Sequence, residues 1–142
     1  MEQLRLRGAQ ELHAVCRSFV DDVNSRLRHS FLVLSPAEFA QAGFREDGAN
    51  LVQINLRGRL LQIEYQVTED LFSQDDFRIP YILKGSVRSF NQELLDANRV
   101  DEQLLFYCPN ETSGDWHAFD CRTYRTGLLD ADYLASALER LI

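Results

Sequence analysis

Residues 51–67 read LVQINLRGRLLQIEYQV, and this stretch decides the fold. Apolar and polar side chains alternate on both sides of Gly58, a period of two that is typical of strands with one buried and one solvated face. We therefore predict a β-hairpin with its turn at Gly58. Because an isolated hairpin is barely stable, its apolar face must be covered by other elements. That face carries Val52, Ile54, Leu56, Leu61, Ile63, Tyr65 and Val67.

Both ends of the chain offer amphipathic helices to cover this face. Residues 9–28 place apolar side chains at spacings of three and four, which predicts a helix with one apolar stripe. Before Gly8, Leu4 and Leu6 alternate with arginines, so this segment fits either the same helix or a short extended arm. Near the C-terminus, residues 123–129 lead to a helix capped by Asp130.

The segments between these elements are shorter. Residues 31–34 fit a strand or a buried connector, and Ser35-Pro36-Ala37-Glu38 has the pattern of a helix start, with a stop at Gly43. Residues 68–76 are acidic and predict a solvated loop. Residues 79–90 predict a third strand, which Pro80 and Gly85 mark as an edge strand or a bulged one. A short helix over 91–98 and a second hairpin from 103–108 and 116–122 complete the pattern.

Together these segments predict one α+β domain over residues 1–142, with element order α-α-β-β-β-α-β-β-α. Short connections between consecutive strands favour a five-stranded antiparallel sheet, with the N- and C-terminal helices on one face. From residue 9 onward, this order and the acidic composition resemble the type III secretion chaperones. That resemblance implies a small acidic protein that dimerises and holds segments of client proteins.

Composition narrows the classes of partner and compartment. The net charge of −7 and a pI near 4.9 disfavour nucleic acid and anionic membranes as partners. We expect a cytoplasmic protein, since the N-terminus lacks a secretory signal and no apolar run is long enough to cross a membrane. The three cysteines are an odd number at irregular spacing, which fits reduced thiols in the cytosol. Lys84 is the only lysine, which we interpret as the codon usage of a GC-rich, bacterial genome.

Candidate binding residues lie on the polar face of the first three strands and near the second hairpin. Amides and mixed charges there offer hydrogen bonds to a peptide or a second subunit, and aromatic side chains could anchor an interface. The set is Gln53, Asn55, Gln62, Glu64, Lys84, Arg88, Tyr107 and Trp116, with Gln66 and Ser86 on the same predicted face. We therefore predict a non-catalytic protein-binding domain of adaptor, chaperone-like or regulatory type, working as a homodimer without metal or cofactor.

Two alternatives stay open from sequence. One is a domain that binds a small apolar ligand between sheet and helices, with walls from Phe19, Tyr65, Tyr81, Phe106 and Phe119. The other is a thiol- or zinc-dependent enzyme. Alternation would put His117, Phe119 and Cys121 on one strand face, with Cys108 across the hairpin and with His13 and Cys16 on the first helix as further possible ligands. The opposing interpretation makes Cys16 and Cys121 small core residues and His117 a partly buried histidine.

Overall fold

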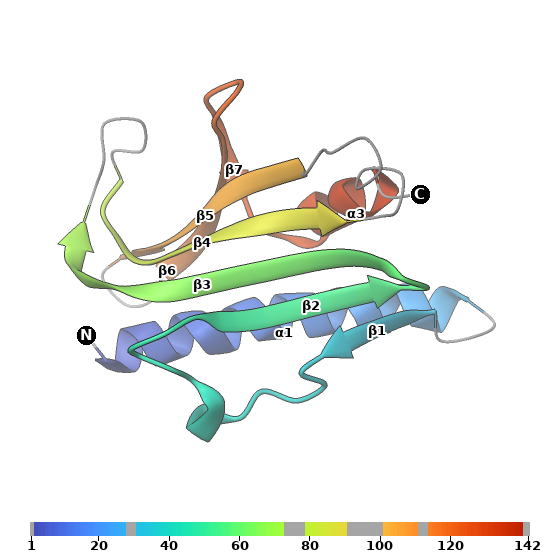
Figure 1. Ribbon diagram of the computed structural model, residues 1–142, viewed down its shortest axis with the longest axis horizontal. Coiled ribbons are helices and arrows are strands. Elements are labelled where there is room, and N and C mark those ends of the chain that lie inside the picture. The colour runs from blue at the N-terminus through green and yellow to red at the C-terminus, as the bar shows by residue number, and fades with distance from the viewer. Residues whose placement is uncertain (1, 28–30, 73–78, 91–100, 111–113, 141–142) are drawn as a thin grey trace.

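The computed structural model describes residues 2–27, 31–72, 79–90, 101–110 and 114–140, and it shows an α+β domain (Figure 1). Helix α1 (Glu2–Arg26) comes first and helix α3 (Ala131–Glu139) last. Between them lie β1 (Leu32–Ser35), the 3-10 turn η1 (Gln41–Gly43), β2 (Asn50–Leu56), β3 (Arg59–Phe72), β4 (Tyr81–Phe90), β5 (Asp101–Pro109), β6 (Gly114–Asp120) and β7 (Arg125–Leu128). The predicted helix over 91–98 lies outside the described residues.

The predicted central hairpin is confirmed as strands β2 and β3. Val52 pairs with Ile63 and Leu56 with Arg59, so the turn consists of Arg57 and Gly58. Both turn residues have positive φ, 50° and 88°, which is the conformation of the two-residue turn that matches the twist of paired strands. Most apolar side chains of the pattern are buried, as expected: Ile54 and Ile63 are each 1% exposed, whereas Leu56 and Val67 are partly buried.

The strands form one antiparallel sheet in the order β1-β2-β3-β4-β5-β6-β7. The prediction of five strands is therefore wrong, because residues 32–35 and 125–128 add one strand at each edge. The predicted acidic loop over 68–76 is also partly wrong, because β3 continues to Phe72 before the described chain is interrupted. Every strand pairs with its neighbour in sequence, so the whole sheet is a meander.

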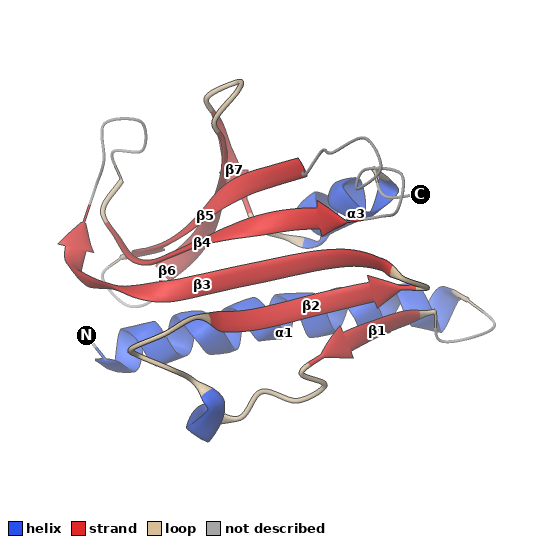
Figure 2. Ribbon diagram, viewed as in Figure 1, coloured by secondary structure: helices blue, strands red, loops and turns tan. Residues whose placement is uncertain are grey.

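Both helices cover the same face of the sheet, here called the inner face (Figure 2). Helix α1 starts at Glu2 and runs through Gly8, so the alternative of an extended arm is wrong. Its residues Leu12, Cys16 and Phe19 share one core cluster with the inner face and with Leu134 and Ala137 of α3. Asp130 caps α3, as predicted, by accepting a hydrogen bond from the Tyr133 amide at 2.9 Å.

The helix predicted from residue 35 does not form. Ser35 stays in β1, opposite Gln53, and the segment after it is tied to α1 instead. The Pro36 carbonyl oxygen lies 2.7 Å from His13 Nε2, and the Ala37 carbonyl accepts from Arg17 Nη1 at 2.5 Å. Both carbonyls are therefore hydrogen-bonded to side chains of α1 and not to a helix of their own. In residues 36–44 the only helical turn is η1.

Strand β4 lies between β3 and β5, so the prediction of an edge strand is wrong. The register between β3 and β4 does shift between Val67 and Phe72, but the extra residues at this shift lie on β3, and the pairing of β4 around Gly85 is regular. Beyond the shift, Tyr81 leaves the face of Leu83 and packs against Phe106 with ring centroids 4.5 Å apart. With Cys108 and Phe119 these two rings form a second, smaller buried cluster on the opposite face of the sheet.

Candidate functional site

The predicted polar residues of β2, β3 and β4 share the sheet face that points away from α1, here called the outer face. Their backbone positions alternate with the buried residues, and the register sets Gln53 beside Gln62 and Gln62 beside Arg88. In Figure 1 the helix α1 passes behind β2 and β3, so the viewer looks at the outer face. The structure thus brings six predicted residues together: Gln53, Asn55, Gln62, Glu64, Lys84 and Arg88.

A shallow pocket of about 290 Å³ lies on the outer face over β3, β4 and β5. Glu64, Lys84, Arg88 and Glu102 bring two acidic and two basic groups to it. Arg88 Nε donates to Glu102 Oε2 at 2.5 Å, and both side chains are about 40% exposed. An exposed pair of this kind contributes little to stability. The pocket therefore presents charges of both signs on a surface that the helices leave open.

Of the aromatic residues predicted as interface anchors, Tyr124 is 67% exposed, whereas Tyr107 and Trp116 lie in the core. Their positions alternate with those of the outer face, so both rings point to the inner face under α1. Trp116 Nε1 donates to the Gly8 carbonyl at 2.8 Å, and Tyr107 Oη donates to Glu11 Oε2 at 3.1 Å. The two rings contact each other at 5.3 Å between centroids. Their role in the structure is to seat α1 on the sheet.

Sequence reasoning left out two apolar side chains of the outer face. Val33 on β1 is 60% exposed and Leu51 on β2 is 47% exposed. Val33 lies opposite Asn55, and Leu51 lies opposite Glu64. The alternation of the hairpin already placed Leu51 out of phase with Val52 and Ile54, so this exposed residue could have been found from sequence. Val33 could not, because β1 was not firmly predicted.

A second pocket of about 290 Å³ lies beside the core, between α1, the segment 36–44 and the start of β2. We call it the side pocket. Its lining is mostly apolar and comes from His13, Pro36, Glu38, Phe39, Ala40, Gly43, Phe44, Ala49, Asn50, Leu51, Val52 and Tyr65. It differs from the predicted ligand site. Phe19 and Tyr65 belong to the inner core, whereas Tyr81, Phe106 and Phe119 lie on the other side of the sheet, so the five predicted walls cannot enclose one ligand.

The cysteines and histidine of the second hairpin do not form one cluster. Cys108 pairs with Asp115 in the ladder, and Cys121 follows six positions later, beyond the end of β6. At about 3.3 Å per residue the two thiols are separated by roughly 20 Å along the strand. Cys121 is exposed, so the interpretation of it as a core residue is wrong, while Cys16 is buried as that interpretation required. Cys16 and His13 belong to α1, which covers the inner face, whereas His117 pairs with Phe106 and faces the outer side of the sheet.

The protonation of these groups follows from their surroundings. Burial, and secondarily the charge of Asp115, raise the pKa of the Cys108 thiol to about 12. Burial also raises the pKa of Cys16 to about 12. The pKa of His117 is lowered by burial, with Asp115 acting in the opposite direction. At neutral pH both thiols are protonated and therefore poor nucleophiles and poor metal ligands.

Comparisons with known proteins do not assign this chain to a family. A scan of family models, a search of curated proteins and a search of solved structures each found no match. The resemblance to the secretion chaperones is not supported by any of these comparisons.

In the described part of the chain, no three His, Cys, Asp or Glu side chains gather in a way that could hold a metal ion. Among those same residues, no helix has the length and apolar character needed to cross a membrane.

Proposed function

We propose that this chain is a non-catalytic protein-binding domain, of adaptor, chaperone-like or regulatory type, that acts as a homodimer. The single observation that carries the proposal is the asymmetry of the sheet. Two helices cover the inner face, while the outer face over β1 to β5 presents amides, mixed charge and two exposed apolar side chains. Amides, charges of both signs and exposed apolar side chains on one uncovered sheet face are groups that a partner protein can bond and pack against.

The charges of the outer face suit a contact between two copies. A two-fold contact places the same patch of each subunit against the other, so that patch must complement itself. Lys84 and Arg88 lie on the same patch as Glu64 and Glu102, and two such patches related by a two-fold axis can set opposite charges against each other. Val33 and Leu51 would supply the apolar contact.

The homodimer is tested by light scattering coupled to size exclusion, with Leu51→Lys as the disrupting variant. Glu64 opposite Leu51 can accept the new ammonium group, so the variant is expected to fold. The control is Leu27→Lys, because Leu27 is similarly exposed, at 42%, but lies beyond α1. We expect a dimer for the wild type and for Leu27→Lys, and a monomer for Leu51→Lys. A wild type that stays monomeric at high concentration would overturn the dimer.

A second candidate function, the binding of a small apolar ligand, is favoured by the side pocket. Its volume is near the lower limit of known ligand sites, and its apolar lining with a few polar groups is typical of them. Ala40→Trp would fill the pocket, and Ala14→Trp on the exposed side of α1 is the matched control. Titration with a fluorescent fatty acid should then show one saturable site that only Ala40→Trp removes. Equal binding by both variants would exclude the side pocket.

A further inference from the structure

The two edges of the sheet differ in how their backbone groups are satisfied. At β1, the Asn24 side chain donates to the Leu32 carbonyl at 2.9 Å and accepts from the Leu32 amide at 3.0 Å, as a neighbouring strand would. At β7, Thr123 Oγ1 accepts from the Arg125 amide at 3.4 Å, but in the described chain no side chain bonds the backbone of Thr126 or Leu128; β7 pairs with β6 alone, and all four of its residues are exposed. Natural proteins commonly block open edges, so an edge left open indicates a place for another strand.

The ladder identifies which groups of β7 point away from the sheet. The Leu129 amide donates to the Trp116 carbonyl at 3.0 Å, so the backbone of Leu129 faces β6. In an antiparallel strand the direction alternates, so Gly127 also faces β6, whereas the N–H and C=O groups of Thr126 and Leu128 point outward. These four groups match the hydrogen-bonding pattern of an added strand. Leu128 is also 53% exposed, which offers apolar contact to that strand.

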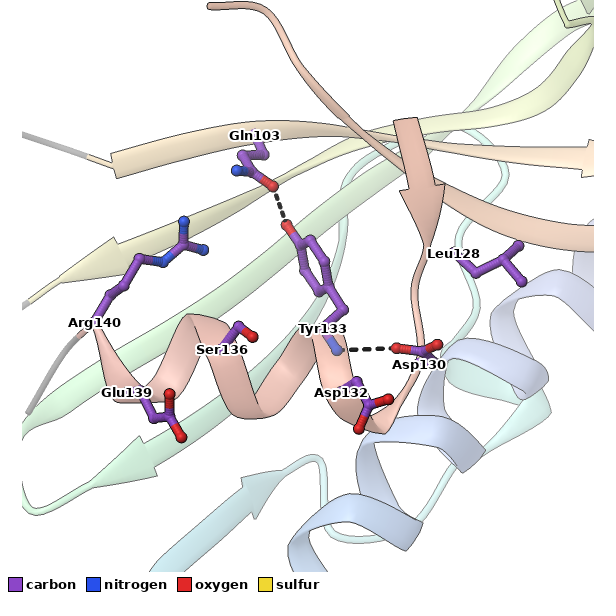
Figure 3. A pocket seen from close by; sticks show the side chains of 8 residues that line it. All are labelled: Gln103, Leu128, Asp130, Asp132, Tyr133, Ser136, Glu139 and Arg140. Atoms are coloured by element: carbon purple, nitrogen blue, oxygen red, sulfur yellow. Dashed lines mark hydrogen bonds between the residues drawn. The ribbon is translucent and has the colours of Figure 1, made fainter. Parts of the chain in front are cut away.

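A groove of about 650 Å³ lies along α3, and Leu128 of β7 belongs to its lining (Figure 3). It is lined by Gln103, Leu128, Asp130, Asp132, Tyr133, Ser136, Glu139 and Arg140. Three of these side chains are carboxylates and one is a guanidinium, so the groove is acidic. Asp130 is engaged as the cap of α3, but Asp132 and Glu139 make no hydrogen bond or ion pair within the described chain. Their charge is available to a basic partner.

We propose that the β7 edge accepts an extended, basic segment of a partner protein as an eighth strand. Backbone groups of Thr126 and Leu128 would pair with the segment, and its lysine or arginine side chains would lie against Asp132 and Glu139. A second copy of this chain fits the groove less well, since its net charge of −7 opposes that of the groove. This surface is separate from the outer-face patch, so the proposal does not depend on the homodimer.

The test uses the full chain and a synthetic eight-residue peptide with alternating valine and lysine. A peptide with glutamate in place of lysine is the charge control. The variant Thr126→Pro removes an outward N–H that β6 does not use, and Thr126→Val keeps that N–H and serves as its matched control. The double variant Asp132→Asn with Glu139→Gln removes charge from the groove while leaving the backbone edge intact.

Binding is followed by calorimetry and by hydrogen exchange of the Thr126 and Leu128 amides. We expect the lysine peptide to bind and to protect both amides, and binding to weaken at least about tenfold in Thr126→Pro and in the charge variant. Thr126→Val and Leu51→Lys should bind as the wild type does. Raising the ionic strength to about 0.5 M should weaken binding, since salt screens exposed charges.

Several results would overturn the proposal. They are an absence of peptide binding to the folded wild type, equal binding of the glutamate peptide, and binding that neither the proline nor the charge variant weakens. Self-association that Thr126→Pro abolishes and Leu51→Lys leaves intact would assign the edge to a second copy instead. Should Thr126→Pro not fold, as judged by circular dichroism, the charge variant alone decides the outcome.

Discussion

Gly8 and Gly85 are positions where a missing side chain lets two elements meet. A Cβ atom at Gly8 would lie 2.7 Å from Cδ2 of Tyr107 and 2.9 Å from Cδ1 of Leu83, both on the sheet under α1. A Cβ atom at Gly85 would lie 2.2 Å from the Glu64 carbonyl oxygen. From sequence, both glycines looked like interruptions of a helix and a strand. The structure shows that they are points of close packing instead.

Replacing Gly8 by alanine should therefore lower the free energy of unfolding. Alanine favours a helix over glycine by about 1 kcal/mol. Overpacking against Tyr107 should cost more, about 1–3 kcal/mol. Urea unfolding measures the balance, and Gly43→Ala is the control, because no atom lies within 4 Å of a Cβ built there. A Gly8→Ala protein more stable than the wild type would show that α1 does not sit this close to β4 and β5.

His117 makes stability depend on pH in one direction. Burial lowers its pKa in the folded chain below the ordinary 6.5, so below that pH the unfolded chain binds a proton that the folded chain does not. The free energy of unfolding should then fall as pH decreases from 6.5 through the folded pKa. His117→Gln removes this contribution, so it should lose less stability than the wild type between about pH 7.5 and about pH 5. An unchanged pH dependence in urea unfolding would show that His117 does not titrate in this way.

At the scale of elements, the β1 edge depends on one side chain of α1. Asn24→Ala should lose two hydrogen bonds to Leu32, each contributing about 0.5–1.5 kcal/mol, and should leave an open edge that favours aggregation. Thermal unfolding and light scattering measure the two effects. Gln10→Ala, at an exposed position of the same helix, is the control and should change neither. Equal behaviour of the two variants would mean that Asn24 does not protect the edge.

The elements that sequence predicted well are those with a long, regular pattern. The hairpin of β2 and β3 and the stripe of α1 each repeat one period over many residues, so local pattern and tertiary packing agree. Residues 35–43 carried a good local helix signal, but His13 and Arg17 engage the carbonyls of Pro36 and Ala37 from a distant helix. Strand β7 has four residues, all exposed, and therefore no alternation to detect. Pairing with β6 decides its conformation.

At the scale of the whole molecule, alternation correctly placed six of the candidate residues on one polar face opposite the helices, and their role in binding stays a prediction. It could not place Tyr107 and Trp116, because an aromatic residue on a strand serves a core or an interface equally well until the covering helix is known. Nor could it find the contrast between the two sheet edges. That contrast depends on two hydrogen bonds between Asn24 of α1 and Leu32 of β1, which no pattern along the chain reports.

The central claim is that the inner face of the sheet is the main core and that the polar part of the outer face is a contact surface. Hydroxyl-radical footprinting of the wild type at dilute and high concentration tests both parts. We predict that Ile54 and Ile63 are protected at every concentration, whereas Val33 and Leu51 react in dilute solution and become protected as the protein is concentrated. Reaction of Ile54 and Ile63 in dilute solution, or reactivity of Leu51 that does not change with concentration, would contradict the account.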